Sequence, residues 1–158
     1  MRRSTRMAVP TVAGLAIVGG LAIAHAGTAQ EPGMRTLTLV QKKTKPTFVD
    51  LGRKSSSSFN PSPGDLTVFA AKLSQPDGTP AGRSQGYCVA ADVRHRGEQC
   101  SYSFDLREGQ IDGEGKVVYG RRFSIPVSGG TGAYEGARGS VAFTVGRRSD
   151  RLEIRLLP

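Results

Sequence analysis

The sequence has no tryptophan, two cysteines and two histidines, and this scarcity limits its side-chain chemistry. His25 lies in an N-terminal apolar stretch, which leaves His95 as the one histidine in the rest of the chain. A structural zinc site uses about four ligands, mostly cysteine and histidine, so we expect no metal site. A Ser-His-Asp triad would depend on His95, which stands between two arginines in a predicted turn. We interpret His95 as a surface residue.

Residues 1–26 have the pattern of a secretory signal peptide. The basic start MRRSTRM is followed by an apolar stretch and by Ala24-His25-Ala26, an A-x-A cleavage signal. The alternative is a membrane anchor, but glycines interrupt the apolar stretch and it is only marginally long enough to span a bilayer. We therefore expect a secreted, extracellular protein with no stable membrane span after cleavage.

The chain that remains after cleavage is basic and of single-domain size. Removal of residues 1–26 takes away three arginines and no acids, so the net charge of +9 becomes +6. The remaining 132 of 158 residues are enough for one core. Residues 27–34 are small or polar and predict a flexible mature N-terminus, which leaves 35–158 as the folded domain.

The basic residues come as doublets in different predicted loops or strand ends, Lys42-Lys43, Arg121-Arg122 and Arg147-Arg148. Nucleic-acid binding favours a continuous basic patch with stacking aromatics, so we expect no nucleic-acid partner. The doublets are interpreted as solvated surface. Affinity for anionic cell-envelope polymers is the alternative.

Hydrophobic periodicity of two runs through the chain and predicts an all-β protein. In Arg151–Leu157, for example, Leu152, Ile154 and Leu156 share one face. Such patterns predict an antiparallel barrel or a sandwich, and the alternation does not separate the two. The eight predicted strands are Arg35–Val40, Asp65–Leu73, Gly86–Ala91, Gln99–Leu106, Gln110–Tyr119, Arg122–Val127, Ser140–Val145 and Arg151–Leu157.

The two cysteines fit one hairpin. Cys88 and Cys100 lie six residues either side of Arg94, so strands paired around a turn at His95-Arg96-Gly97 bring them face to face. Opposite positions of an antiparallel pair are close enough for a disulfide. The alternatives are two reduced, buried thiols or a reactive Cys88.

Two irregular segments separate the predicted strands. The stretch PVSGGTGAYEGARGS at 126–140 lacks the helix and the G-x-G-x-x-G spacing of a phosphate-binding loop. We interpret it as a turn between strands, with its structural glycines at Gly129, Gly130, Gly132, Gly136 and Gly139. The stretch GRKSSSSFNPSPG at 52–64 is either a plain connector or a lid over a cavity mouth.

Four motifs, in this order, resemble the superfamily of plant dirigent proteins and allene oxide cyclases. They are PGDLTVFAAKL at 63–73, GRSQGYCVA at 82–90, CSYSFDLREGQIDGEG at 100–115 and VSGGTGAYEGARGSVAFT at 127–144. The last is similar to the dirigent pattern GGTG-x-F-x-x-ARG. The resemblance implies an eight-stranded antiparallel β-barrel with a largely apolar cavity, associating as trimers or dimers.

The resemblance also implies candidate site residues. Phe69 matches an aromatic that lines the cyclase cavity, and Cys88 matches a cavity cysteine unless it is bridged. Arg138 matches the arginine of ARG, as a polar anchor for a ligand or as a structural partner of a loop carbonyl. With Phe69, the candidate walls of the cavity are Tyr102, Phe104 and Tyr134.

Two positions depart from the family pattern. Ala71 stands where the cyclases have an asparagine. The first strand, Leu37–Gln41, has no acid where the cyclases use a glutamate and the dirigent proteins an aspartate. These differences leave open whether the protein is an enzyme.

The resemblance implies a barrel that binds a small, mostly apolar molecule in its central cavity and directs its stereoselective cyclisation or coupling. It needs no cofactor for this, because conformational control supplies the chemistry. As an enzyme it would be an isomerase of the cyclase kind. The alternative is a noncatalytic extracellular binding or structural module, which the missing acid of the first strand favours.

Overall fold

The structure is a computed structural model that describes residues 33–52, 60–118 and 120–158. The predicted signal peptide lies outside these residues. The described chain forms nine strands and two single-turn 3₁₀ helices: β1 (Arg35–Lys42), β2 (Thr47–Val49), β3 (Leu66–Ser74), β4 (Pro80–Asp92), η1 (Val93–His95), β5 (Gly97–Leu106), β6 (Gly109–Val118), β7 (Arg122–Gly130), η2 (Gly132–Tyr134), β8 (Gly139–Thr144) and β9 (Ser149–Leu156). Within the described residues, no helix has the length and hydropathy needed to cross a membrane.

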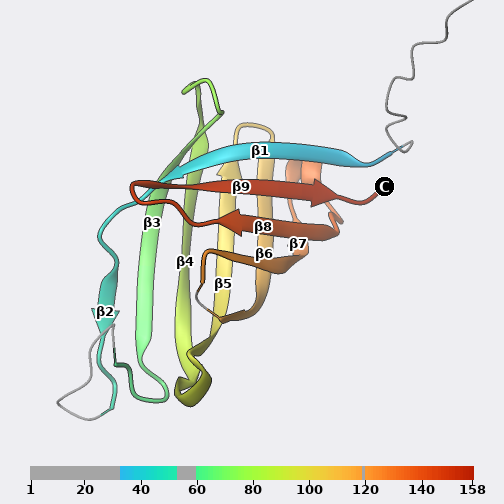
Figure 1. The fold of residues 1–158 in the computed structure, drawn as a ribbon. Coiled ribbons are helices and arrows are strands. Elements are labelled where there is room, and N and C mark those ends of the chain that lie inside the picture. Colours follow the sequence, from blue (N-terminus) through green and yellow to red (C-terminus); the bar gives the residue numbers. More distant parts are fainter. Residues whose placement is uncertain (1–32, 53–59, 119) are drawn as a thin grey trace, which may run out of the picture.

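The strands form a closed antiparallel barrel. Neighbours follow the order β1-β9-β8-β7-β6-β5-β4-β3, and β1 pairs with β3 to close the ring. In Figure 1, β1, β9 and β8 run across the view, and β3 to β6 stand upright behind them. The short β2 pairs with the beginning of β3, whereas β1 pairs with the end of β3. The prediction of an eight-stranded antiparallel barrel is confirmed.

The predicted strands correspond to β1 and β3 to β9, with shifts at several strand ends. β7, for example, continues to Gly130, so the predicted turn glycines Gly129 and Gly130 lie within that strand. β4 begins at Pro80 instead of Gly86, so that Gly82 to Gln85 extend the pairing with β5. Their glycine and polar residues carry little strand propensity, and cross-strand pairing decides their conformation. β2 was not predicted, because three residues are too few for a periodic pattern.

Alternating residues of each strand fill the barrel. β5 shows the pattern plainly, because Cys100, Tyr102 and Phe104 are buried while Ser101 and Ser103 are partly exposed. The same alternation in the other strands builds a single core. Its buried members include Leu39, Leu73, Cys88, Cys100, Tyr102, Phe104, Ile111, Val117, Ile125, Val127, Val141, Phe143, Leu152, Ile154 and Leu156.

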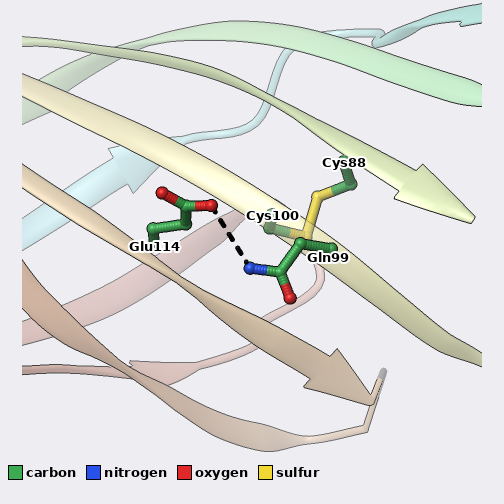
Figure 2. The surroundings of a disulfide bond; sticks show 4 residues. All are labelled: Cys88, Gln99, Cys100 and Glu114. Atoms are coloured by element: carbon green, nitrogen blue, oxygen red, sulfur yellow. Dashed lines mark hydrogen bonds between the residues drawn. A yellow bond between two sulfur atoms is a disulfide. The ribbon is translucent and has the colours of Figure 1, made fainter. Parts of the chain in front are cut away.

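The two cysteines form a disulfide inside the barrel. Cys88 of β4 and Cys100 of β5 are direct register partners, and their Cα atoms are 4.0 Å apart. Figure 2 shows the bridge between the two strands, with the hydrogen bond from Gln99 to Glu114 beside it. Both sulfur-bearing residues are fully buried. The predicted bridge is confirmed, and Cys88 has no free thiol.

The barrel has two ends, which we name after their 3₁₀ helices. The η1 end carries the β4–β5, β6–β7 and β8–β9 connections, together with the chain between β1 and β3. The η2 end carries the β3–β4, β5–β6 and β7–β8 connections, and also the start of β1 and the end of β9. The antiparallel order therefore assigns every connection to one end or the other.

The glycine-rich segment joins β7 to β8 at the η2 end. β7 ends at Gly130, η2 follows directly, and β8 begins at Gly139. Gly139 has φ +146° and lies so close to β9 that a Cβ there would be 1.8 Å from the Arg155 carbonyl oxygen. Gly129 has no atom within 4 Å of its would-be Cβ. The glycines of this segment therefore differ in how strongly the backbone requires them.

We predict that Gly139→Ala destabilises the barrel by at least about 2 kcal/mol, because it combines a strained backbone with a clash against β9. Gly129→Ala is the matched control, and we expect it to change the free energy of unfolding by less than about 0.5 kcal/mol. Urea unfolding of both variants measures the difference. Equal effects would contradict the close approach of β8 to β9.

Candidate functional site

Two carboxylates face the barrel interior at the η1 end. Glu98 of β5 pairs with Ala90 on one side and Val117 on the other, both buried on the inner face. Asp150 of β9 alternates with the buried Leu152 and Ile154, which gives it the same inward direction. Each acid is partly buried. The structure thus brings together two acids that are 52 positions apart in the sequence.

A tyrosine hydroxyl lies deeper on the same face. Tyr102 is four residues after Glu98, which makes it the second inward position beyond Glu98 on β5. Only 5% of the Tyr102 surface is exposed. Burial raises the pKa of the Tyr102 phenol, and the negative charges of Glu98 and Asp150 raise the pKa further. Tyr102 therefore keeps its proton at neutral pH and can donate a hydrogen bond.

Neighbouring polar groups orient Asp150. Its Oδ1 accepts a hydrogen bond from the Gly146 backbone N–H at 3.1 Å and lies 3.3 Å from Lys43 Nζ. Gln41 is its register partner on β1 and accepts a hydrogen bond from the buried Ser84 hydroxyl at 2.9 Å. These contacts hold Asp150 at the inner edge of the β8–β9 turn.

Aromatic rings surround the polar groups. The Tyr102 ring centroid lies 4.8 Å from that of Phe69 and 5.1 Å from that of Phe143. Phe123 stacks on Phe143 at 4.4 Å. Gly86 makes room for Phe69, because a Cβ at Gly86 would lie 2.8 Å from Phe69 Cζ. The interior at this end is thus lined by aromatic rings, and its polar groups are the Tyr102 hydroxyl and the carboxylates of Glu98 and Asp150.

Solvent reaches the inner face at the η1 end. The inward residues nearest the rim are half-buried, whereas those of the next layer, such as Phe143 and Val117, are buried. We name these partly exposed rim residues the η1 mouth: Thr67, Phe69, Glu98, Phe123 and Asp150. The η1 mouth thus combines aromatic rings and carboxylates on one inward face.

The chain on both sides of residues 53–59 is attached beside this mouth. The buried carboxylate of Asp65 accepts hydrogen bonds from the Leu51 N–H at 3.0 Å and the Ser62 N–H at 2.7 Å. Gly64 donates to the Ala90 carbonyl at 2.8 Å, next to the mouth. Residues 53–59, the centre of the predicted connector or lid, lie outside the described residues.

The predicted site residues fall into two groups. Phe69 and Tyr102 belong to the η1 mouth, and Phe104 packs behind Tyr102 with ring centroids 6.0 Å apart and no exposed surface. Tyr134 and Arg138 lie at the opposite, η2 end, where both line a hollow of about 410 Å³. The structure therefore brings the first three together and separates them from the other two.

Three groups of the η2 end interact with one another. Arg35 donates to Glu108 at 2.7 Å, and its guanidinium carbon lies 5.2 Å from the Tyr134 ring centroid. The Arg35 guanidinium lowers the pKa of the Glu108 carboxyl. Arg138 is exposed, and its backbone carbonyl accepts a hydrogen bond from Leu157 at 2.9 Å. Arg35, Glu108 and Tyr134 are thus linked to one another, and all three line a hollow of about 370 Å³.

One cluster of potential metal ligands occurs among the described residues. Cys88, Glu98 and Cys100 have ligand atoms within 4.8 Å of one another. Both sulfurs are bonded in the disulfide, and a bridged sulfur is not the thiolate that binds zinc or iron. We assign no metal to this cluster.

Glu98 and Asp150 were not among the residues predicted from the sequence. The signal was present, because Glu98 stands at the alternating position before Cys100, Tyr102 and Phe104, and Asp150 before Leu152 and Ile154. Two inward cysteines in a hairpin would have assigned the inner face of β5 and hence Glu98. The first strand lacks an acid, as the sequence shows, and the inward acids lie on β5 and β9 instead.

A closed antiparallel barrel with polar groups set in an apolar interior is the class of protein that fold and site define. The model of the allene oxide cyclase barrel-like domain matches residues 36–156. The chain therefore belongs to the allene oxide cyclase barrel-like family. No curated protein shows significant sequence similarity to it.

Several solved structures share this fold. Pyocyanin demethylase is 25% identical with a TM-score of 0.68, and the match covers 77% of this chain and 99% of that one. An exo-specific intermolecular Diels-Alderase is 17% identical with a TM-score of 0.64, over 78% of this chain and 97% of that one. A pterocarpan synthase dirigent protein is 16% identical with a TM-score of 0.60, over 80% and 95%.

We predict that Tyr102 makes the stability of the barrel fall at alkaline pH. An unfolded tyrosine releases its proton near pH 10, whereas the raised pKa of Tyr102 keeps the proton in the folded state, so stability is lost as the pH rises above about 10. Tyr102→Phe removes this contribution. Between pH 8 and about pH 11 its free energy of unfolding should gain about 1.4 kcal/mol relative to the wild type.

Denaturant unfolding across this pH range measures the change. Tyr87→Phe is the matched control, because the Tyr87 ring is 48% exposed on the outer face. An equal pH-dependent gain in both variants would contradict the role of Tyr102.

Proposed function

We propose that the protein binds a small, mostly apolar molecule at the η1 mouth and directs its stereoselective cyclisation. One observation carries the proposal: a protonated phenol and two carboxylates, Tyr102, Glu98 and Asp150, face the same aromatic wall. Both acids occupy inward positions of their strands, where an apolar residue would avoid the cost of partly burying a charge.

The three polar groups have complementary roles in such a reaction. The Tyr102 hydroxyl donates a hydrogen bond to an oxygen of the bound molecule. The Glu98 carboxylate accepts a proton from one atom of the molecule and returns it to another, and Asp150, oriented by Lys43, supplies a fixed negative charge. A ring closure of this kind is an isomerisation, so it consumes no oxidant, reductant or cofactor.

The aromatic wall contributes the stereochemistry. Phe69, Tyr102, Phe143 and Phe123 form one continuous row of ring contacts that a flexible apolar molecule must follow. Holding the reacting atoms close together supplies much of the rate in such a reaction. The names of the similar structures, a demethylase, a Diels-Alderase and a pterocarpan synthase, support a small-molecule ligand, and the Diels-Alderase supports ring formation.

We also propose that the protein acts outside the cytoplasm. The buried Cys88–Cys100 disulfide supports this location, because structural disulfides persist in oxidising compartments. The mass of the protein recovered from culture medium tests it and should correspond to a chain that begins at Gly27. The same native mass spectrum gives the state of association, for which the family resemblance leads us to expect a dimer or trimer.

We predict that a bulky side chain in the η1 mouth blocks binding. Thr67 points inward, since it pairs with the buried Cys88, and the next residue, Val68, is 43% exposed on the outer face. Thr67→Trp should weaken binding of the neutral apolar dye Nile red at least about tenfold, because it fills the space beside Phe69. Val68→Trp, the matched control, should leave binding unchanged.

Fluorescence titration measures both affinities, and thermal unfolding confirms that both variants are folded. Wild-type dye affinity in a folded Thr67→Trp variant would place the binding site elsewhere, with the hollow beside Tyr134 as the next candidate.

We predict that Glu98→Gln separates binding from reaction. The substitution keeps the shape of the side chain and removes its ability to accept a proton. Native mass spectrometry of protein from culture medium, before and after organic extraction, should recover a bound molecule from both forms. The wild type should release the cyclised product and the variant its open isomer, which has the same mass and a different chromatographic retention.

Glu114→Gln on the outer face of β6 is the matched control and should release the product. The same cyclised molecule from the Glu98 variant would remove the catalytic role. Protein recovered without any ligand, together with no dye binding, would instead favour a noncatalytic module.

A further inference from the structure

The fold gathers the basic doublets at the η1 end. Lys42 ends β1 and Lys43 follows it. Arg121 lies in the β6–β7 connection and Arg122 at the start of β7, and Arg147 and Arg148 lie in the β8–β9 turn. All six are exposed. They are spread over 107 positions of the sequence, and they share one end because antiparallel order assigns each of these positions to it.

Backbone hydrogen bonds join the three segments that carry these residues. The Lys43 N–H donates to the Arg148 carbonyl at 3.2 Å, which joins the end of β1 to the β8–β9 turn. The Val145 N–H donates to the Arg121 carbonyl at 2.9 Å, which joins that turn to the β6–β7 connection. We name the six residues the basic arc: Lys42, Lys43, Arg121, Arg122, Arg147 and Arg148.

Most of the charge of the basic arc is uncompensated. Within the described residues, its ion pairs are limited to Lys43 with Asp150. The β4–β5 connection adds the exposed Arg94 and Arg96 to the same end. At the η2 end, in contrast, Arg35 is paired with Glu108. Arg107 and Arg138 are also exposed at the η2 end, but the basic arc with Arg94 and Arg96 places more exposed cations around the η1 mouth, so the positive potential is higher there.

Two exposed aliphatic side chains accompany the charge. Val118, at the end of β6, is 49% exposed, and Leu51, which is hydrogen-bonded to Asp65 at the start of β3, is 63% exposed. Basic residues with exposed aliphatic ones are the composition of surfaces that lie at a lipid interface. A soluble polyanion would require only the basic residues.

We propose that the η1 end docks on an anionic lipid bilayer. The basic arc contacts the headgroup phosphates, and Val118 and Leu51 contact the boundary with the acyl chains. This orientation turns the η1 mouth toward the bilayer, so an apolar molecule dissolved in the lipid can reach the aromatic wall without crossing water. The docking itself does not depend on what reaction follows.

Vesicle co-sedimentation tests the docking. The full chain without its leader should bind vesicles that contain phosphatidylglycerol, should not bind pure phosphatidylcholine vesicles, and should release as salt is raised. The double variant Arg147→Glu/Arg148→Glu should bind at least about twentyfold more weakly, since each basic residue near an anionic surface contributes about fivefold in affinity. Val118→Ser should weaken binding several-fold.

The matched control is Arg107→Glu/Arg138→Glu, which makes the same charge change with exposed residues of the η2 end. It should retain binding within about threefold, because screening limits the reach of surface charges to about 10 Å. An equal loss in both double variants would mean attraction by net charge alone, and the oriented docking would be wrong. Absence of binding to phosphatidylglycerol vesicles would also overturn it.

Binding of soluble polyphosphate tests whether the partner is a bilayer or any polyanion. If it binds as tightly as the vesicles and Val118→Ser has no effect, the partner is a polyanion and the bilayer proposal fails. Thr67→Trp should bind vesicles like the wild type. Docking and ligand binding can therefore fail independently in these experiments.

Discussion

The pairing of β1 with β3 is the contact on which the rest of the structure depends. Three register pairs, Val40 with Ser74, Gln41 with Leu73 and Lys42 with Lys72, turn an open sheet into a ring. A closed ring has no free edge along which strands can slip, and a slip of one residue would reverse every inward and outward side chain. The inward direction of Glu98, Tyr102 and Asp150 follows from this closure.

The position of the acids within the barrel reflects the cost of burying charge. Glu98 and Asp150 stand in the outermost inward layer, where water still reaches them, and the layers beyond are filled by groups such as Phe104, Ile111 and Leu152. An ionised carboxylate in those dry layers would need a full set of partners. Tyr102 lies between the two environments as a neutral donor. The polarity of the inward side chains thus falls from charged at the η1 rim to apolar at the centre within a few strand positions.

The sequence allowed most of the fold to be predicted and less of the site. Alternation identified β1 and β3 to β9, and the spacing around Arg94 identified the disulfide, because both depend on local geometry. The short β2 and the first residues of β4 depend on pairing with β3 and β5, and they were missed. The resemblance to dirigent proteins and cyclases identified Phe69. It led away from Glu98 and Asp150, because the acid of those relatives is on a different strand.

The amino-acid order by itself determined strand identity, the hairpin that bridges Cys88 to Cys100, and the side-chain period that divides each strand into two faces. Only the tertiary structure decided which face is the inner one in every strand and which loops meet at each end. For that reason Tyr134 and Arg138, predicted to share a cavity with Tyr102, lie at the opposite end of the barrel. The three basic doublets, distant in the sequence, lie at the same end around the η1 mouth. The physical reason is that periodicity depends on neighbouring residues, whereas register and closure depend on pairings between distant strands.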